Sequence, residues 1–233
     1  MKNGMGFSLR IFNPALVADH ELEVLDRVYE LWKRVWVETR REVDSSLPTP
    51  SDNFSRQDEI FALFDGDRPI GTVCHRYVDL RSSFALDDSF FSGSIWPAHV
   101  LAKLPSLGRT CALGSHIFVD RAYRKGASGL PIKNLLCGLS FARMNVTKPD
   151  LFLGMMRKDK GLHELLYRSG GVTLHADANW YQIPVDLIAF FPSKQKIEID
   201  PAFAGPIHEI IAGCKYFGRT DEKRAQRALK RAS

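Results

Sequence analysis

The sequence of 233 residues lacks several features, and each absence excludes a class of protein. No run of about 18 apolar residues occurs, so we expect no membrane-spanning helix. No apolar secretory segment lies near the N-terminus, and the four cysteines form no C-x-x-C pair, which favours a reducing cytoplasm. The G-x-x-x-x-G-K-[ST] loop of nucleoside triphosphatases and the G-x-G-x-x-G fingerprint of dinucleotide-binding folds are both missing. No set of metal ligands is predicted either.

Surplus positive charge is missing from most of the chain. The formal net charge is +5, and the segment from Lys215 to Ser233 alone carries seven basic side chains against two acidic ones. The remaining 214 residues are balanced, with 25 basic and 25 acidic side chains. We therefore expect no nucleic-acid partner for the body of the protein. The basic tail is open to three interpretations: a solvated end, a docking element for an acidic protein, or a contact with anionic lipid or nucleic acid.

The most informative segment that is present runs from Ala112 to Ala142. An apolar strand at Ile117–Val119 leads into a basic turn that contains glycine, and a helix with a leucine face follows. Unpaired backbone N–H groups and the helix dipole favour an anion at such a helix N-terminus. The sequence therefore predicts a phosphate site in this turn, formed by Arg124, Lys125, Gly126, Ala127, Ser128 and Gly129.

Hydrophobic periodicity and turn signals predict the other elements. In order, these are a strand at 7–12, an amphipathic helix at 22–36, a polar loop at 41–57, a hairpin of strands 59–64 and 69–77, an insertion at 81–110, a strand at 150–156, a helix at 161–169 and a last strand at 180–185. We divide the chain into a main domain at 1–190, which includes the insertion, and a C-terminal helical extension with the basic tail at 191–233.

The basic turn resembles the pyrophosphate-binding segment of the GNAT superfamily of acyltransferases, whose pattern is Arg/Gln-x-x-Gly-x-Gly/Ala. A second segment adds to the resemblance, because Leu166, Tyr167 and Gly171 match the superfamily element Leu-Tyr-x-x-x-Gly-Phe. The order of predicted elements also follows the superfamily from about Phe7 to Val185. The resemblance implies an α/β (α+β) fold in which helices flank a mixed, mostly antiparallel, splayed sheet.

Within the superfamily, Gly71–Arg76 and Leu113–Asp120 resemble the branch of acyl-homoserine lactone synthases and N-acyl amino acid synthases. Leu113 stands where the lactone synthases carry Glu, and His116 stands where they carry Arg. The resemblance thus favours an N-acyl amino acid synthase, which moves a long acyl chain from acyl carrier protein to the nitrogen of an amino acid. An acetyl-CoA-dependent N-acetyltransferase, a lactone synthase and a catalytically silent module that binds acyl thioesters stay open as alternatives.

The resemblance also implies roles for individual residues. The amine attacks the thioester directly, and the backbone N–H groups of Ile117 and Phe118 stabilise the developing oxyanion. Tyr167 protonates the departing thiolate. His116 has chemistry suited to a general base near neutral pH. No tightly bound cofactor is expected, and acyl-phosphopantetheine on acyl carrier protein, or acyl-CoA, is the co-substrate.

Two further sets of basic residues are candidates for binding. Arg34 and Arg76 are candidates for holding the carboxylate of the amino acid substrate through a bidentate guanidinium. Acyl carrier protein is strongly acidic, so it is expected to dock on the basic tail or on the cluster of Arg121, Arg124, Lys125 and Lys133.

Overall fold

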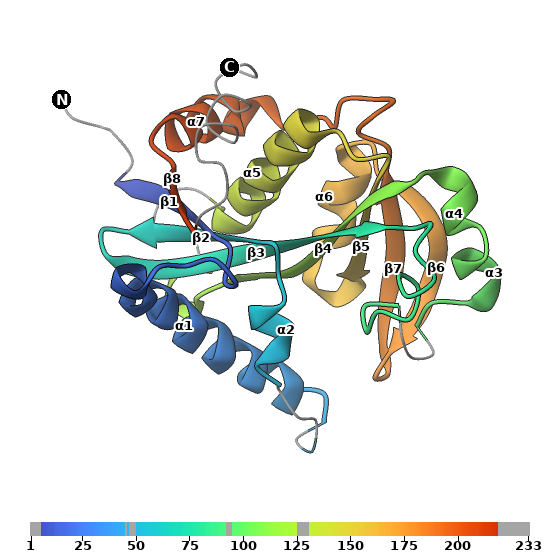
Figure 1. The fold of residues 1–233 in the computed structure, drawn as a ribbon, viewed down its shortest axis with the longest axis horizontal. Coiled ribbons are helices and arrows are strands. Elements are labelled where there is room, and N and C mark those ends of the chain that lie inside the picture. The colour runs from blue at the N-terminus through green and yellow to red at the C-terminus, as the bar shows by residue number, and fades with distance from the viewer. Residues whose placement is uncertain (1–5, 45, 47–49, 92–94, 125–130, 219–233) are drawn as a thin grey trace. The chain divides into compact units, whose positions relative to one another are not determined.

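The computed structural model describes residues 6–44, 46, 50–91, 95–124 and 131–218. The described residues form two compact units. Unit 1 comprises those within Met1–His75, His116–Val146 and Ile199–Ser233, and unit 2 comprises those within Arg76–Ser115 and Thr147–Glu198. Figure 1 labels the elements, of which β3 (Arg68–Asp79) and β4 (Thr110–Val119) each continue from one unit into the other.

Unit 1 is built on strands in the order β4-β3-β2-β1-β8. The β1/β2 and β2/β3 pairs are antiparallel, whereas β1 and β8 pair in parallel. The β2–β3 hairpin turns at Gly66, whose φ of 57° lies in the left-handed region that glycine adopts without strain. The other elements of this unit are β1 (Phe7–Phe12), η1 (Asp19–Glu21), α1 (Leu22–Arg41), α2 (Asp52–Ser55), β2 (Glu59–Asp65), η2 (Arg121–Tyr123), α5 (Ile132–Thr147), α7 (Pro201–Ala212) and β8 (Lys215–Phe217).

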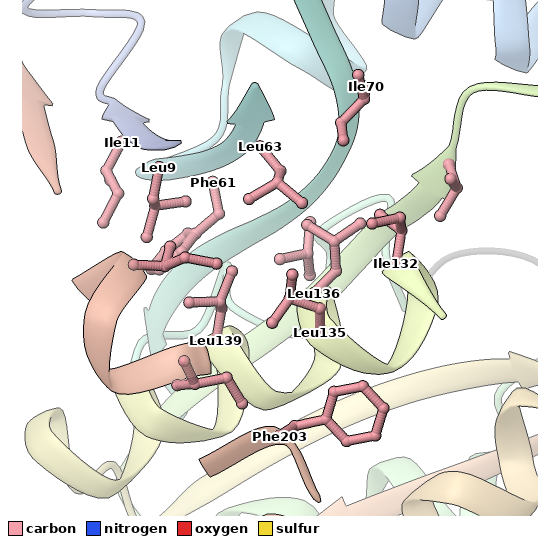
Figure 2. Close-up of a cluster of buried hydrophobic side chains, with 14 of the residues drawn as sticks. Leu9, Ile11, Phe61, Leu63, Ile70, Ile132, Leu135, Leu136, Leu139 and Phe203 are labelled. Atoms are coloured by element: carbon pink, nitrogen blue, oxygen red, sulfur yellow. The ribbon is translucent and has the colours of Figure 1, made fainter. Parts of the chain in front are cut away.

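Strand β2 shows why the sheet of unit 1 is covered on both faces. Its residues are apolar without alternation, and successive side chains of a strand point to opposite faces. Phe61 and Leu63 enter a core with α5 and α7, shown in Figure 2. Ile60 and Phe64 enter a second core with α1. Accordingly, α5 and α7 lie on one side of these strands in Figure 1, and α1 lies on the other.

Unit 2 has the strand order β6-β7-β5-β4. The β6/β7 and β5/β7 pairs are antiparallel and the β4/β5 pair is parallel. The β4/β5 register joins Cys111–Gly114 to Leu151–Gly154, and β4 then runs on to Val119 and β5 to Arg157. The other elements of this unit are α3 (Ala98–Leu101), α4 (Leu104–Leu107), β5 (Leu151–Arg157), η3 (Lys158–Lys160), α6 (Leu162–Arg168), β6 (Val172–Trp180) and β7 (Ile183–Phe190).

The predicted fold class is confirmed: helices flank a mixed and mostly antiparallel arrangement of strands. The predicted strand at 180–185 is wrong. Tyr181 and Gln182 have φ values of 48° and 68° and form the turn between β6 and β7, so the segment belongs to two strands. In the predicted helical extension, α7 is followed by the strand β8, and Phe203 and Tyr216 are buried in the core of unit 1. Among the described residues, no helix is both long enough and apolar enough to cross a bilayer.

Candidate functional site

In unit 1, strand β4 is distorted at His116. This residue has a φ of 50°, which is unusual for a residue with a side chain and marks a break in regular strand geometry. The hydroxyl of Thr72 on β3 donates a 3.1 Å hydrogen bond to the carbonyl of His116 and fixes the distorted backbone. Such strained conformations persist where the surrounding structure holds them, and they are common at functional sites.

The imidazole of His116 lies against two tryptophans of α1. Its ring centroid is 5.6 Å from that of Trp32 and 4.9 Å from that of Trp36, both in edge-on geometry. Burial of the ring lowers its pKa to about 3, and the nearby cations of Arg56 and Arg40 contribute to the shift. The imidazole is therefore neutral at pH 7, and a base with so low a pKa accepts a proton poorly. The predicted role of general base gains no support from these surroundings.

Ile117 and Phe118 follow the distortion directly. The side chain of Ile117 packs on the core with α5, and that of Phe118 is buried in the core with α1. Their side chains are structural, so any contribution to catalysis comes from the backbone N–H groups. Strand distortions of this kind interrupt the regular pairing of a strand. The role of the Ile117 and Phe118 N–H groups in binding an oxyanion stays a prediction.

The predicted phosphate turn is described only at its two ends. Lys125, Gly126, Ala127, Ser128 and Gly129 lie outside the described residues. Arg124 is exposed, and its Nε donates a 2.8 Å hydrogen bond to the carbonyl of Val119 at the end of β4. On the other side of the turn, the Pro131 carbonyl accepts hydrogen bonds from the N–H groups of Asn134 and Leu135 as α5 begins.

Arg34 forms part of an ion-pair cluster on Asp120. One oxygen of this carboxylate is 2.9 Å from Nη2 of Arg34 and 3.1 Å from Nη2 of Arg68, and the other accepts the N–H of Ala122 at 3.0 Å. Burial alone would raise the pKa of Asp120, but the Ala122 N–H and the two cations outweigh it and lower the pKa. Both guanidiniums remain largely exposed. Arg34 would therefore have to share its guanidinium between Asp120 and a substrate carboxylate.

In unit 2, the resemblance singles out Arg76 and Leu113, and both lie among residues that stabilise the fold. Nη1 of Arg76 is 2.5 Å from Oδ2 of Asp88, a carboxylate that is almost completely buried. Leu113, which stands where lactone synthases carry Glu, is 1% exposed in the apolar core of this unit. A carboxylate would be costly to bury at that position.

Tyr167 on α6 is held by two hydrogen bonds. Its hydroxyl donates to Oδ2 of Asp186 on β7 at 2.6 Å and accepts from Oγ1 of Thr173 on β6 at 3.1 Å. Burial and the Asp186 carboxylate raise the pKa of the phenol, while Thr173 and the cation of Lys158 act in the opposite direction. The phenol is therefore protonated at neutral pH, as a general acid has to be.

Asp186 is 2% exposed, although it lies in a strand that is otherwise apolar. The β6/β7 register shifts between His175 and Ala178, and Asp177 within this bulge has a φ of 53°. The N–H of Asp177 donates to Oδ1 of Asp186 at 3.0 Å, and Nζ of Lys158 lies 3.9 Å from the same oxygen. These contacts and the bond from Tyr167 lower the pKa of Asp186 although burial alone would raise it.

Three residues of these surroundings were not found from the sequence. Arg40 and Arg56 carry no motif and approach His116 only in the fold. Asp186 did leave a signal, since a single acidic residue interrupts the apolar strand Ile183–Phe190. The structure describes His116, Arg34 and Arg124 in unit 1, and Tyr167 and Arg76 in unit 2.

No family model and no curated protein matches the sequence. A solved structure of BjaI, a CoA-dependent acyl-homoserine lactone synthase with SAM and isopentyl-CoA, is similar over 97% of this chain and 99% of its own, with a TM-score of 0.58 and 16% identity. FeeM, an N-acyl amino acid synthase from uncultured soil microbes, is similar over 82% and 93%, with a TM-score of 0.54 and 18% identity. The lactone synthase LasI is similar over 81% and 91%, with a TM-score of 0.51 and 13% identity. At these identities, the likeness shows that the chain has the fold of these enzymes.

Proposed function

We propose that this chain is an N-acyltransferase that moves an acyl group from an acyl-carrier-protein or CoA thioester to the amino group of an amino acid. The observation that carries the proposal is the fold, which the chain shares with FeeM over 82% of its length. The distortion of β4 at His116 and the hydrogen-bonded Tyr167 add chemistry that suits acyl transfer. The buried Leu113 favours the N-acyl amino acid synthases over the lactone synthases, because the resemblance places a Glu there in the latter.

The reaction requires few catalytic groups. An α-amino group has a pKa of roughly 8 or above, so it is mostly protonated at neutral pH and must first lose a proton. The neutral amine then attacks the thioester carbon without an enzyme nucleophile. The N–H groups of Ile117 and Phe118 stabilise the oxyanion of the tetrahedral intermediate. As the C–S bond breaks, Tyr167 gives its proton to the thiolate. The proton released by the amine passes to water, because the neutral His116 accepts it poorly.

Binding of the two substrates is assigned to basic residues. Arg124 and the backbone of residues 125–129 hold the phosphate of the pantetheine arm. Arg34 holds the carboxylate of the amino acid by sharing its guanidinium with Asp120. We assign no such role to Arg76, because its guanidinium pairs with the buried carboxylate of Asp88.

A product assay tests this function. The purified chain is incubated with acyl-carrier-protein and acyl-CoA donors of two to sixteen carbons and a mixture of the twenty amino acids, and N-acyl amino acids are detected by mass spectrometry. We expect one amino acid to be acylated, with release of free thiol in equal amount. Transfer of acetyl groups alone would point to an N-acetyltransferase instead. Donor binding without any product would favour a binding module.

The donor is identified by its response to salt. Docking of an acidic carrier protein on basic residues weakens as salt screens the charges. We expect kcat/KM with the carrier-protein donor to fall steeply between 50 and 500 mM salt, and turnover with acyl-pantetheine to change little. Equal sensitivity of both donors would contradict carrier docking and favour acyl-CoA.

A further inference from the structure

The hydrogen bonds around Tyr167 show on which bond its phenol proton lies. An ionised carboxylate can only accept hydrogen bonds, so the single phenol proton lies on the 2.6 Å bond to Asp186. The hydroxyl of Thr173 then donates its own proton to the phenol oxygen. The resulting chain runs from Thr173 through Tyr167 to Asp186. All three residues belong to unit 2, on β6, α6 and β7.

We propose that Asp186 is a positioning residue for Tyr167, holding its hydroxyl in one orientation and in its protonated form, and that it thereby sets the alkaline limit of acyl transfer. This inference rests on the proposed function, in which Tyr167 protonates the thiolate. One oxygen of the buried carboxylate accepts from the phenol of Tyr167, and the other accepts from the N–H of Asp177. A 2.6 Å O–H···O⁻ bond is in the range of the stronger, charge-assisted hydrogen bonds.

In the acid step, one proton moves from Tyr167 to the leaving thiolate. The phenol turns from Asp186, its O–H bond breaks, and an S–H bond forms on the leaving thiolate. The phenolate that is left takes up a proton from solvent before the next turnover and returns to Asp186. A phenolate beside a carboxylate is unfavourable, and the cation of Lys158, 3.9 Å from Asp186, offsets part of this repulsion.

The charged or titratable groups that face this pair come from three elements. Lys158 of η3 binds Asp177 at 2.7 Å and approaches Asp186. Asp177 of β6 donates its backbone N–H to Asp186. On α6, the ring of His163 lies edge-on to Tyr167 with centroids 6.1 Å apart. Asp186 itself hydrogen-bonds the phenol through an ionised side chain, and the hydroxyl of Thr173 is its other hydrogen-bond partner.

The ionisation of the phenol can be measured directly. The chain has six tyrosines, and with tyrosine labelled by ¹³C at the Cζ position, a Tyr167→Phe variant identifies the Tyr167 resonance. In the Asp186→Asn variant, we expect the pKa of Tyr167 to fall by at least half a unit, because a neighbouring negative charge is removed. Thr173→Val removes a donor that stabilises the phenolate, so we expect a small shift to higher pH. Thr173 is exposed, which keeps the test available if Asp186→Asn does not fold.

The matched control is Asp159→Asn. This substitution removes the same charge in the same unit. The carboxylate of Asp159 accepts hydrogen bonds from Arg157 and has no bond to Tyr167 or Asp186. We expect it to leave the Tyr167 titration unchanged. If Asp159→Asn shifts the titration as far as Asp186→Asn does, or if Asp186→Asn leaves it unmoved, the pair has no special role and the proposal is wrong.

Kinetics then connect the pair to catalysis. The fall of kcat at alkaline pH should occur at lower pH in Asp186→Asn than in the parent, by the same shift as the Tyr167 resonance. If the Tyr167 resonance shifts in Asp186→Asn but the pH dependence of kcat does not, the catalytic part of the proposal is wrong. The hydrogen-bonded pair of Tyr167 and Asp186 would still be supported. If the chain transfers no acyl group at all, the proposed function fails, and the resonance still decides whether Asp186 controls Tyr167.

Discussion

In unit 1 the imidazole of His116 lies against two tryptophans near the cations of Arg40 and Arg56, whereas in unit 2 the phenol of Tyr167 is hydrogen-bonded to a buried carboxylate. Burial and cations lower the pKa of the imidazole, and burial and an anion raise that of the phenol. Both groups are therefore neutral at pH 7. A neutral imidazole with a low pKa is a poor base, but a neutral phenol still has a proton to donate. The surroundings thus favour Tyr167 over His116 as the group that transfers a proton.

The largest expected effect comes from removing the phenol hydroxyl. Loss of a general acid typically costs 10²- to 10⁴-fold in rate, so we expect Tyr167→Phe to lower kcat by about 100-fold or more without changing donor affinity. Stopped-flow turnover and a donor-binding titration measure the two quantities. Tyr181→Phe is the matched control, since Tyr181 lies in the same unit and is 50% exposed. A kcat within threefold of the parent would remove Tyr167 from the mechanism.

Acid should destabilise unit 1 through a partly buried ion pair between Glu59 on β2 and Arg143 on α5. Glu59 binds Arg143 and lies 3.7 Å from His75. Burial alone would raise the pKa of Glu59, but these partners lower it to about 2. Because the folded-state pKa is depressed, the stabilisation is complete above about pH 4.5 and is lost as the pH falls toward 2, on the order of 3 kcal/mol in total.

Urea unfolding between pH 7 and pH 3 measures this loss. The pKa of the buried His75 is also lowered, so its protonation adds to the destabilisation as the pH falls below 6.5. Glu59→Gln should reduce the stability at pH 7 and flatten its decline between pH 4.5 and 3. The exposed Glu30→Gln should do neither. An unchanged slope in Glu59→Gln would show that other groups cause the acid sensitivity.

The two candidate carboxylate-binding arginines should respond differently to replacement. Arg76→Gln leaves the buried Asp88 without its cation, and we expect a loss of about 2 to 3 kcal/mol in unfolding free energy. Arg34→Gln should cost less than about 1 kcal/mol, because Asp120 keeps Arg68 and the Ala122 N–H, and Arg34 is exposed. Its effect should fall on catalysis instead, as a rise of about threefold to tenfold in KM for the amino acid. Equal stability losses, or an unchanged KM in Arg34→Gln, would contradict this division of roles.

A turn or a site residue could be predicted from the sequence where the residues that determine it are close together in the chain. The β2–β3 hairpin could be predicted because Gly66 lies between two apolar runs and suits a positive φ. The β6–β7 hairpin could not, because its turn consists of Tyr181 and Gln182, which rarely adopt positive φ. Tyr167 could be found through a short motif around it. Its partner Asp186 is 19 residues away with no motif of its own, and only strand pairing and the β6 bulge bring the two together.

The smallest expected effect is a change in the pKa of His116 when a neighbouring cation is removed. Burial is the main cause of its lowered pKa and the cations of Arg56 and Arg40 are lesser ones, so removing one cation should raise the pKa by a fraction of a unit. NMR titration of the histidine ring protons in Arg40→Gln measures the shift, with His116→Gln to assign the resonance among the seven histidines. Arg41→Gln, one residue further along α1 and exposed, is the control that should leave the titration unchanged. A rise in Arg40→Gln to the ordinary value near 6.5 would mean that the cations, and not the tryptophan-lined burial, keep the imidazole neutral. His116 would then be available as a base whenever an anionic substrate neutralised those cations.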